Sequence, residues 1–147
     1  MRWSLLFLML FMALLLLGCS GETDDSRSLT MADTSVLPVA LHNAHHTTRD
    51  AYRYAVANPD ELAKYPCYCG CNSIGHISNL SCYVQEVKQS GEIVFDLHGS
   101  GCGVCIDITQ DVMRMKRKGM ASPEIRRIID DKYNRFGPPT DTAFPES

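Results

Sequence analysis

The most regular hydrophobic pattern in the chain lies near its C-terminus. Residues 102–118 carry an apolar stripe at steps of three and four, formed by Val104, Ile108, Val112 and Met115. This spacing predicts an α-helix with one buried face. The basic residues 116–118 fall in its last turn, where the helix dipole favours positive charge, and Gly119 is expected to end it.

A second helix is predicted directly after the first. Ser122 is expected to cap it, with Pro123 at its first position and Gly137 beyond its end. Its apolar face is predicted to consist of Ile125, Ile128, Ile129, Tyr133 and Phe136. Because the connection is short, we expect the two helices to pack as an antiparallel hairpin.

Weaker helical patterns precede the cysteine-rich middle of the chain. Residues 41–56 fit an amphipathic helix. Asn58 then predicts the cap of a short helix, with Pro59 at its first position and Glu61 reaching back to the cap. Pro66 is expected to stop this helix just before the first cysteines.

Between the cysteine groups the pattern changes. Residues 81–91 predict a short helix that Gly91 ends, and residues 92–98 alternate apolar and polar side chains, which is typical of a strand. We expect this strand to lack a partner and to pack on helices. The sequence therefore predicts a mainly α fold: a small cysteine-rich helical domain with a C-terminal helical hairpin and at most one short strand.

The boundaries of this domain follow from composition. Residues 41–137 are expected to fold, while 19–40 are polar and acidic and predict a flexible tether. The Pro-rich residues 138–147 are expected to be a disordered tail. A domain of this size gains noticeably from cross-links or a metal.

The N-terminal residues 1–18 have the anatomy of a secretory signal: one positive charge and then a long apolar run. Their end resembles the bacterial lipobox, in which Gly18 precedes a cysteine, here Cys19, that takes a lipid. The alternative is an N-terminal membrane helix with an incidental cysteine. The lipoprotein reading predicts a chain held at the membrane by acyl (palmitate) chains and facing outside the cytoplasm, where thiols can oxidise.

Other function classes find little support. The net charge is −3, and nothing in the composition marks a nucleic-acid binder. The cationic residues 114–118 could face anionic lipid. No nucleophile–base–acid arrangement, phosphate loop or paired-carboxylate pattern occurs, so we expect no hydrolytic catalysis.

The chemistry of the chain lies in its remaining six cysteines, which are Cys67, Cys69, Cys71, Cys82, Cys102 and Cys105. An even number in an exported domain favours disulfides. Neighbours two apart bridge only with strain, so the triplet at 67–71 would have to pair with the other three.

A metal site uses the same residues. Gly70 would let the triplet turn its thiolates toward one point, and Cys102 and Cys105 open a helix whose N-terminus favours thiolate. His76 and His98 lie near the two cysteine groups, and thiolates with imidazoles select copper(I) or zinc. The predicted ligands are Cys67, Cys69, Cys71, Cys82, Cys102, Cys105, His76 and His98.

A redox pair is the third alternative. Cysteines three apart at a helix start, as Cys102 and Cys105 are, suit a reversible dithiol. Against this, Cys105 shares the apolar face of the helix, and the alternation of strands and helices typical of thioredoxin is missing.

The motif PCYCGC at residues 66–71, followed by SCYV, FDLHGSGCGVC and EIRRIIDDKYNRFG, resembles the bacterial PCYCGC-motif lipoproteins over nearly the whole folded region. The resemblance implies a small, lipid-anchored, exported domain and brings no activity. The helical hairpin, with the Cys-x-x-Cys at its start, also has a fainter similarity to the haem-handling thiol subunits of cytochrome c maturation.

The sequence thus predicts a membrane-anchored protein that binds copper or zinc for storage, delivery or detoxification. The alternatives are a disulfide-stapled structural module and a thiol–disulfide exchange protein. A metal transporter or a cytochrome-assembly protein is the expected partner. All three hypotheses require that the two cysteine groups, distant in sequence, meet in space.

Overall fold

The computed structural model describes residues 27–146, so the predicted signal segment and Cys19 lie outside the described residues. Within this range the fold is mainly α, as predicted. The helices are α2 (Val39–His42), α3 (His46–Ala57), α4 (Pro59–Leu62), α5 (His98–Gly101), α6 (Gly103–Arg117) and α7 (Ser122–Tyr133). Short 3₁₀ turns connect them: η2 (Thr34–Val36), η3 (Cys71–Ile74), η4 (Leu80–Cys82) and η5 (Asn134–Phe136). None of the helices between residues 27 and 146 has the length and apolar character needed to cross a bilayer.

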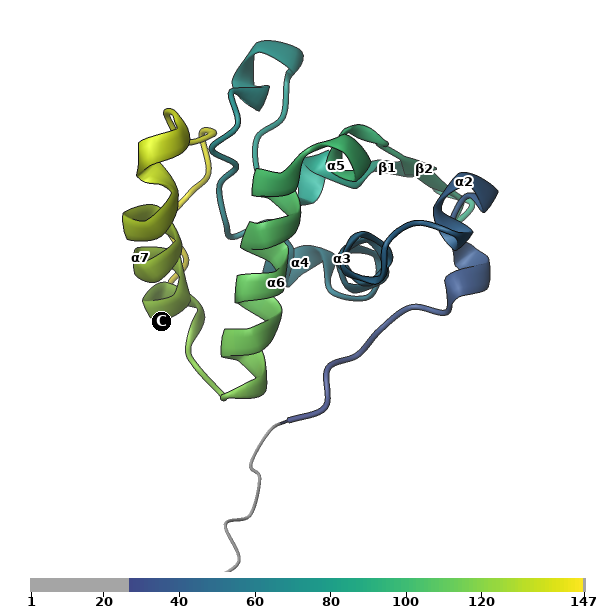
Figure 1. The fold of residues 1–147 in the computed structure, drawn as a ribbon, viewed down its shortest axis with the longest axis horizontal. Coiled ribbons are helices and arrows are strands. Elements are labelled where there is room, and N and C mark those ends of the chain that lie inside the picture. The colour runs from purple at the N-terminus through teal and green to yellow at the C-terminus, as the bar shows by residue number, and fades with distance from the viewer. Residues whose placement is uncertain (1–26, 147) are drawn as a thin grey trace, which may run out of the picture.

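The helices α6 and α7 form the predicted antiparallel hairpin and lie side by side (Figure 1). The α6 stripe is buried as expected at Ile108, Val112 and Met115. Ile128 on α7 and Phe136 in η5 are 39% and 50% exposed, although the sequence predicts them on the buried face. They remain exposed because, within residues 27–146, α6 is the main helix packed along α7, and one such neighbour covers only a narrow stripe.

Helix α3 completes the core by crossing α6, and it is seen end-on beside that helix (Figure 1). It contributes buried tyrosines to a largely aromatic interior. The rings of Tyr52 and Tyr83 meet edge to face at 4.9 Å between centroids, an arrangement that adds to their burial energy. This aromatic layer supports the segment that carries Cys82.

Both predicted caps differ from the structure. Asn58 precedes α4 without capping it, and its side chain donates to the Thr30 carbonyl instead at 2.8 Å. Ser122 is the first residue of α7 rather than its cap, a position that Ala121 occupies, and the Ser122 hydroxyl donates to Glu61 at 2.8 Å. Glu61 therefore connects α4 to the start of α7.

The prediction of a short helix over residues 81–91 is wrong, because only Ser81 and Cys82 are helical, at the end of the 3₁₀ turn η4. Instead β1 (Val84–Val87) pairs antiparallel with β2 (Ile93–Phe95), so the predicted strand does have a partner. Gly91 adopts φ +84°, a left-handed conformation that closes the hairpin. The mainly α fold thus contains one two-stranded sheet rather than at most one strand.

The N-terminal part also differs from expectation. The predicted helix over residues 41–56 is broken between α2 and α3, where Arg49 donates to the free carbonyls of His42 and Ala44. Residues 27–40, expected in the flexible tether, are held by bonds such as Ala32 N–H to the Arg53 carbonyl at 3.1 Å. Leu37 is 3% exposed, and this burial keeps the segment on the domain.

The C-terminal residues 138–146, expected to be disordered, lie along the domain as an ordered strap. Arg126 donates to the carbonyls of Thr142 and Ala143 at 3.2 and 3.1 Å. Thr140 is 3% exposed and exchanges two hydrogen bonds of 2.9 Å with the backbone of Cys67. These polar contacts replace the apolar pattern that sequence analysis relies on, and they fix the cysteine loop from outside.

Candidate metal centre

The loop of residues 66–71 turns three cysteine side chains toward one point. Gly70 adopts φ +85°, which is unfavourable for other residues and reverses the chain inside the motif. The Cys67 sulfur consequently lies 3.0 Å from that of Cys69 and 3.6 Å from that of Cys71. The alternation expected of an extended chain does not apply here.

The other cysteines approach this loop from two further elements. Cys105, in the first turn of α6, places its sulfur 3.4 Å from Cys67 and 3.5 Å from Cys69. Its thiol also donates to Cys82, at the end of η4, over 3.1 Å. Cys102 precedes α6 and lies near Cys69. The prediction that the two cysteine groups meet in space is confirmed.

A buried polar network fixes Cys105 to the loop before Cys82. Asn79, fully buried, donates to the Cys105 carbonyl at 3.3 Å and accepts from the Thr109 hydroxyl at 2.6 Å. The Thr109 hydroxyl also lies 2.8 Å from that of Tyr83. Since every member has a partner, the network holds the sulfur-bearing backbone rigidly.

The two predicted histidines lie at the edge of the sulfur cluster, with their rings in edge-to-face contact at 5.4 Å. His98 Nε2 is 3.4 Å from the Cys71 sulfur and 3.9 Å from that of Cys69. His76 Nδ1 is 3.6 Å from the Cys82 sulfur.

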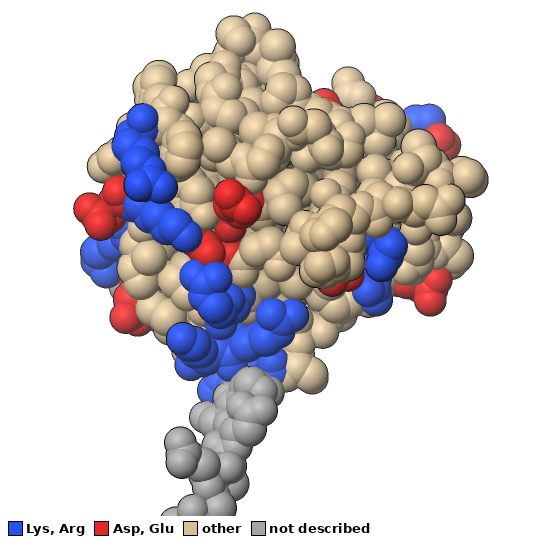
Figure 2. All heavy atoms as spheres, viewed as in Figure 1, with Lys and Arg blue, Asp and Glu red and all other residues tan. Residues whose placement is uncertain are grey.

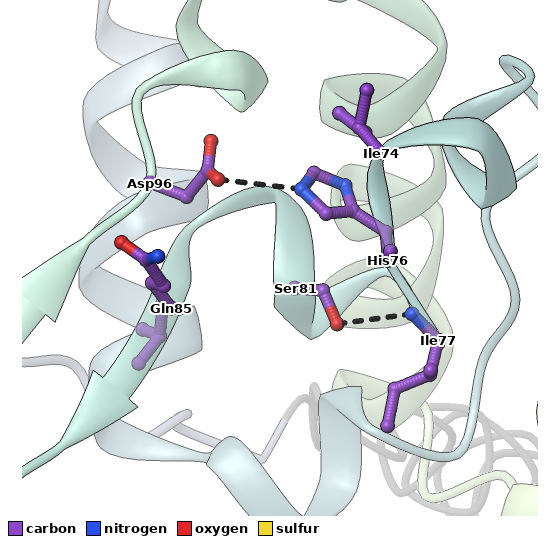
Figure 3. Close-up of a pocket in the computed structure, with 8 residues that line it drawn as sticks. Ile74, His76, Ile77, Ser81, Gln85 and Asp96 are labelled. Atoms are coloured by element: carbon purple, nitrogen blue, oxygen red, sulfur yellow. Dashed lines mark hydrogen bonds and ion pairs between the residues drawn. The ribbon is translucent and has the colours of Figure 1, made fainter.

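Asp96 orients both histidines. Its Oδ2 lies 3.3 Å from His76 Nε2, and its Oδ1 accepts from the His98 backbone N–H at 2.6 Å. A dashed line marks the contact between Asp96 and His76 in Figure 3. A carboxylate on the far nitrogen fixes the ring so that Nδ1, facing Cys82, is free to bind a metal. Sequence analysis did not identify Asp96, although its place two residues before His98 was a usable signal.

The donor atoms form three groups, in each of which they lie within 4.8 Å of one another. The central group is Cys67, Cys69, Cys71 and Cys105. The outer group is Cys69, Cys102 and the exposed His98, and the inner group is Cys71, His76 and Cys82, all buried. Every predicted ligand thus belongs to one of the groups, while Cys19 lies outside the described residues.

The spacing of the central sulfurs fits a metal site. The six cysteines within residues 27–146 are free thiols, and the central sulfur pairs described above are separated by 3.0–3.6 Å. Four sulfurs around a tetrahedral ion at about 2.3 Å stand about 3.8 Å apart, whereas a disulfide requires about 2.05 Å. A small outward movement would therefore accommodate an ion.

The thiols of the central group differ in how readily they lose a proton. Hydrogen bonds from Cys105 and Cys82 hold the pKa of the Cys67 thiol well below its usual range. Burial raises the pKa of Cys69 and Cys71, and hydrogen bonds to Cys67 and Cys82 raise that of Cys105. One thiolate is thus favoured among neutral neighbours, because adjacent buried negative charges repel each other. A cation is needed to ionise the rest.

A pocket of about 290 Å³ lies beside the inner group, lined among others by Ile74, Ser81, Asp96 and His76 (Figure 3). His76 is the only cluster residue in its wall, and no cysteine lines it. The His76 ring therefore borders the pocket and also lies against the Cys82 sulfur.

Comparison of the sequence with known proteins identifies a matching family. A family model described as "Protein of unknown function with PCYCGC motif" matches residues 8–145. Searches of curated proteins and of solved structures gave no match.

Proposed function

The chain belongs to the PCYCGC-motif family, and we propose that it binds a soft metal ion through its cluster of six cysteines and two histidines. The observation that carries this proposal is the convergence of all eight side chains, from four separate segments, into three contiguous groups of donor atoms. Packing alone does not require buried sulfurs to lie next to imidazole nitrogens.

The donor set favours copper or zinc. Thiolates and imidazoles bind both ions well, whereas calcium and magnesium prefer oxygen donors. The four sulfurs of the central group suit a tetrahedral ion, and the two groups of three suit lower coordination. We propose storage, delivery or detoxification as the role, because each requires binding and release of an ion without turnover. The partner that we propose to exchange the ion with this chain is a metal transporter or a cytochrome-assembly protein.

The alternatives explain the geometry less well. A stapled module needs three sulfur pairs, but Cys67 has three sulfur neighbours within 3.6 Å and no single partner. An exchange protein needs Cys102 and Cys105 as a pair, yet Cys102 belongs to the outer group and Cys105 to the central one. The raised pKa of the Cys105 thiol, caused by its hydrogen bonds to Cys67 and Cys82 and by burial, also makes it a weak nucleophile.

We also propose that Cys19 carries a lipid and holds the domain at the outer side of a membrane. The first described residue, Arg27, lies at the end of α6, where its N–H donates to the Arg117 carbonyl at 2.9 Å. Arg27, Arg114, Lys116, Arg117 and Lys118 form a basic face there, and Figure 2 shows Lys and Arg gathered at this end of the molecule. Arg27 follows Cys19 by eight positions in the sequence, which is a reach of about 28 Å at most. A lipid at Cys19 would therefore keep the basic face close to anionic headgroups.

The metal proposal is tested by purifying the full chain anaerobically in detergent and measuring its metal content and thermal unfolding with and without a strong chelator. We expect bound copper or zinc and a large drop in unfolding temperature on chelation, since binding energy becomes folding energy. Excess magnesium is the control ion and should have no effect. A chain that is purified without metal and whose unfolding temperature does not change with copper, zinc or chelator would contradict the proposal.

The anchor has its own test. Replacing Cys19 by serine should release the chain from the membrane fraction while leaving its metal content unchanged. A Cys19→Ser chain that stays in the membrane fraction would show that the N-terminal segment itself is the anchor.

A further inference from the structure

We propose that the cluster holds three divalent soft ions joined by the bridging thiolates of Cys69 and Cys71. This inference rests on the metal-binding function proposed above and adds the number of ions, the ligands they share and the order in which they exchange. It follows from the overlap of the three donor groups.

The overlap falls on sulfur in both cases. Cys69 belongs to the central and the outer group, and Cys71 belongs to the central and the inner group. A thiolate sulfur has three lone pairs and can bind two ions at once, whereas an imidazole nitrogen has one lone pair and binds a single ion. Both histidines belong to one group each. The residues placed between groups are thus those whose chemistry permits bridging.

Charge balance agrees with three ions. Six thiolates carry six negative charges, and a single divalent ion compensates only two of them, so the thiols beyond its reach would stay protonated and could not act as thiolate ligands. Three divalent ions neutralise the set, provided that both histidines are neutral ligands. The protons that the thiols still carry in the metal-free chain pass to solvent as the ions bind, and no atom changes its oxidation state.

The difference in burial between the groups predicts the order in which the ions exchange with solvent. The outer group opens to solvent through the exposed His98, and its two cysteines are half-buried. In the inner group Cys82 is 0% exposed and His76 is 7% exposed. The outer ion should therefore exchange with solvent first. Because Cys69 is a ligand in both groups, an ion could then move through it between the outer group and the central group.

The test uses the full chain in detergent, stripped of metal under reducing conditions and reloaded with Zn²⁺ alone. Native mass spectrometry should show three zinc ions per chain, and a competing chelator should remove one ion first. Two or fewer bound ions would overturn this inference while any bound zinc would still support the proposed function. A chain that binds no zinc would overturn both.

Variants test the sharing itself. His98→Ala changes an exposed side chain and should lose one ion and keep two, with His46→Ala, an exposed histidine on α3, as the matched control that keeps three. Cys102→Ser should also lose only the outer ion. Cys69→Ser should lose the outer ion and should also lower the affinity for the central ion by about tenfold or more. Identical behaviour of the Cys69→Ser and Cys102→Ser chains would rule out bridging by Cys69.

Discussion

The sulfur atoms of Cys67 and Cys105 lie 3.4 Å apart although the two residues are 38 positions apart in the chain. The loop that carries Cys67 is fastened by Thr140 from the C-terminal strap, while Cys105 is fastened by Asn79 from the segment before Cys82. Two segments that are distant in sequence thus hold the two sulfurs close together. Such a preformed arrangement reduces the entropy lost when a metal binds.

Zinc affinity should rise with pH. Burial raises the pKa of Cys69, and hydrogen bonds to Cys67 and Cys82 raise that of Cys105, so both thiols are protonated in the metal-free chain at neutral pH. Each ion must displace such protons. Calorimetry in buffers of different ionisation enthalpy should show more than one proton released per zinc ion. Affinity that stays constant between about pH 6 and 8 would argue against thiolate ligation.

Replacing Asp96 by asparagine should lower the affinity of the inner group for its ion about 10- to 100-fold. An asparagine can keep the bond to the His98 N–H or accept from His76 Nε2–H, but its amide group cannot reproduce both acceptors. Chelator competition on the zinc-loaded chain measures the effect. Asp107→Asn, at an exposed position on α6, is the control and should leave all affinities unchanged.

Gly99→Ala should destabilise the domain by about 1–3 kcal/mol. A Cβ at Gly99 would stand 2.7 Å from the Cys82 carbonyl oxygen and 2.7 Å from the Tyr83 ring, so α5 could not keep its place over the cluster. Gly101→Ala, in the same helix but facing open space, is the matched control. Chemical denaturation compares the two variants, and equal stabilities would refute the close approach.

Glu61 should make the domain sensitive to acid. Burial alone would raise the pKa of Glu61, but hydrogen bonds from Lys64, Tyr65 and Ser122 outweigh it and lower the pKa from 4.5 to about 2. The stabilisation is therefore complete above about pH 4.5 and is lost as the pH falls toward 2.

The Glu61→Gln chain tests this linkage by denaturation at several pH values. It should lose about 1.5–3 kcal/mol at pH 7, because hydrogen bonds to a charged group are lost, and the difference from the natural chain should shrink on acidification. Glu92→Gln, whose side chain is 63% exposed in its pair with Lys88, should change stability little. A difference that persists unchanged at low pH would contradict the assigned role of Glu61.

The sequence predicts the helical hairpin well because Ile108, Val112 and Ile129 carry a strong helical periodicity. It fails at residues 84–95, where a β-hairpin of mixed polarity depends on the turn at Gly91 more than on any apolar pattern. It also fails at residues 138–146, since hydrogen bonds rather than apolar side chains hold the strap, and such bonds leave no periodic signal.

The candidate ligands could be named from the sequence because cysteine and histidine have few roles outside metal, redox and disulfide chemistry. Their partition into three groups could not, since it depends on the left-handed turn at Gly70 and on how η4 and α6 meet. Asp96 and Asn79 escaped prediction for a similar reason. Their roles depend on contacts that only the folded chain creates.

The most direct test of metal binding by the cluster is residue-resolved thiol alkylation of the anaerobically purified full chain, before and after treatment with a strong chelator. The account predicts that the six cysteines from Cys67 to Cys105 resist alkylation while metal is bound and react after chelation. Thiols that react equally without chelator would contradict it, and so would thiols that react only after a disulfide reductant is added.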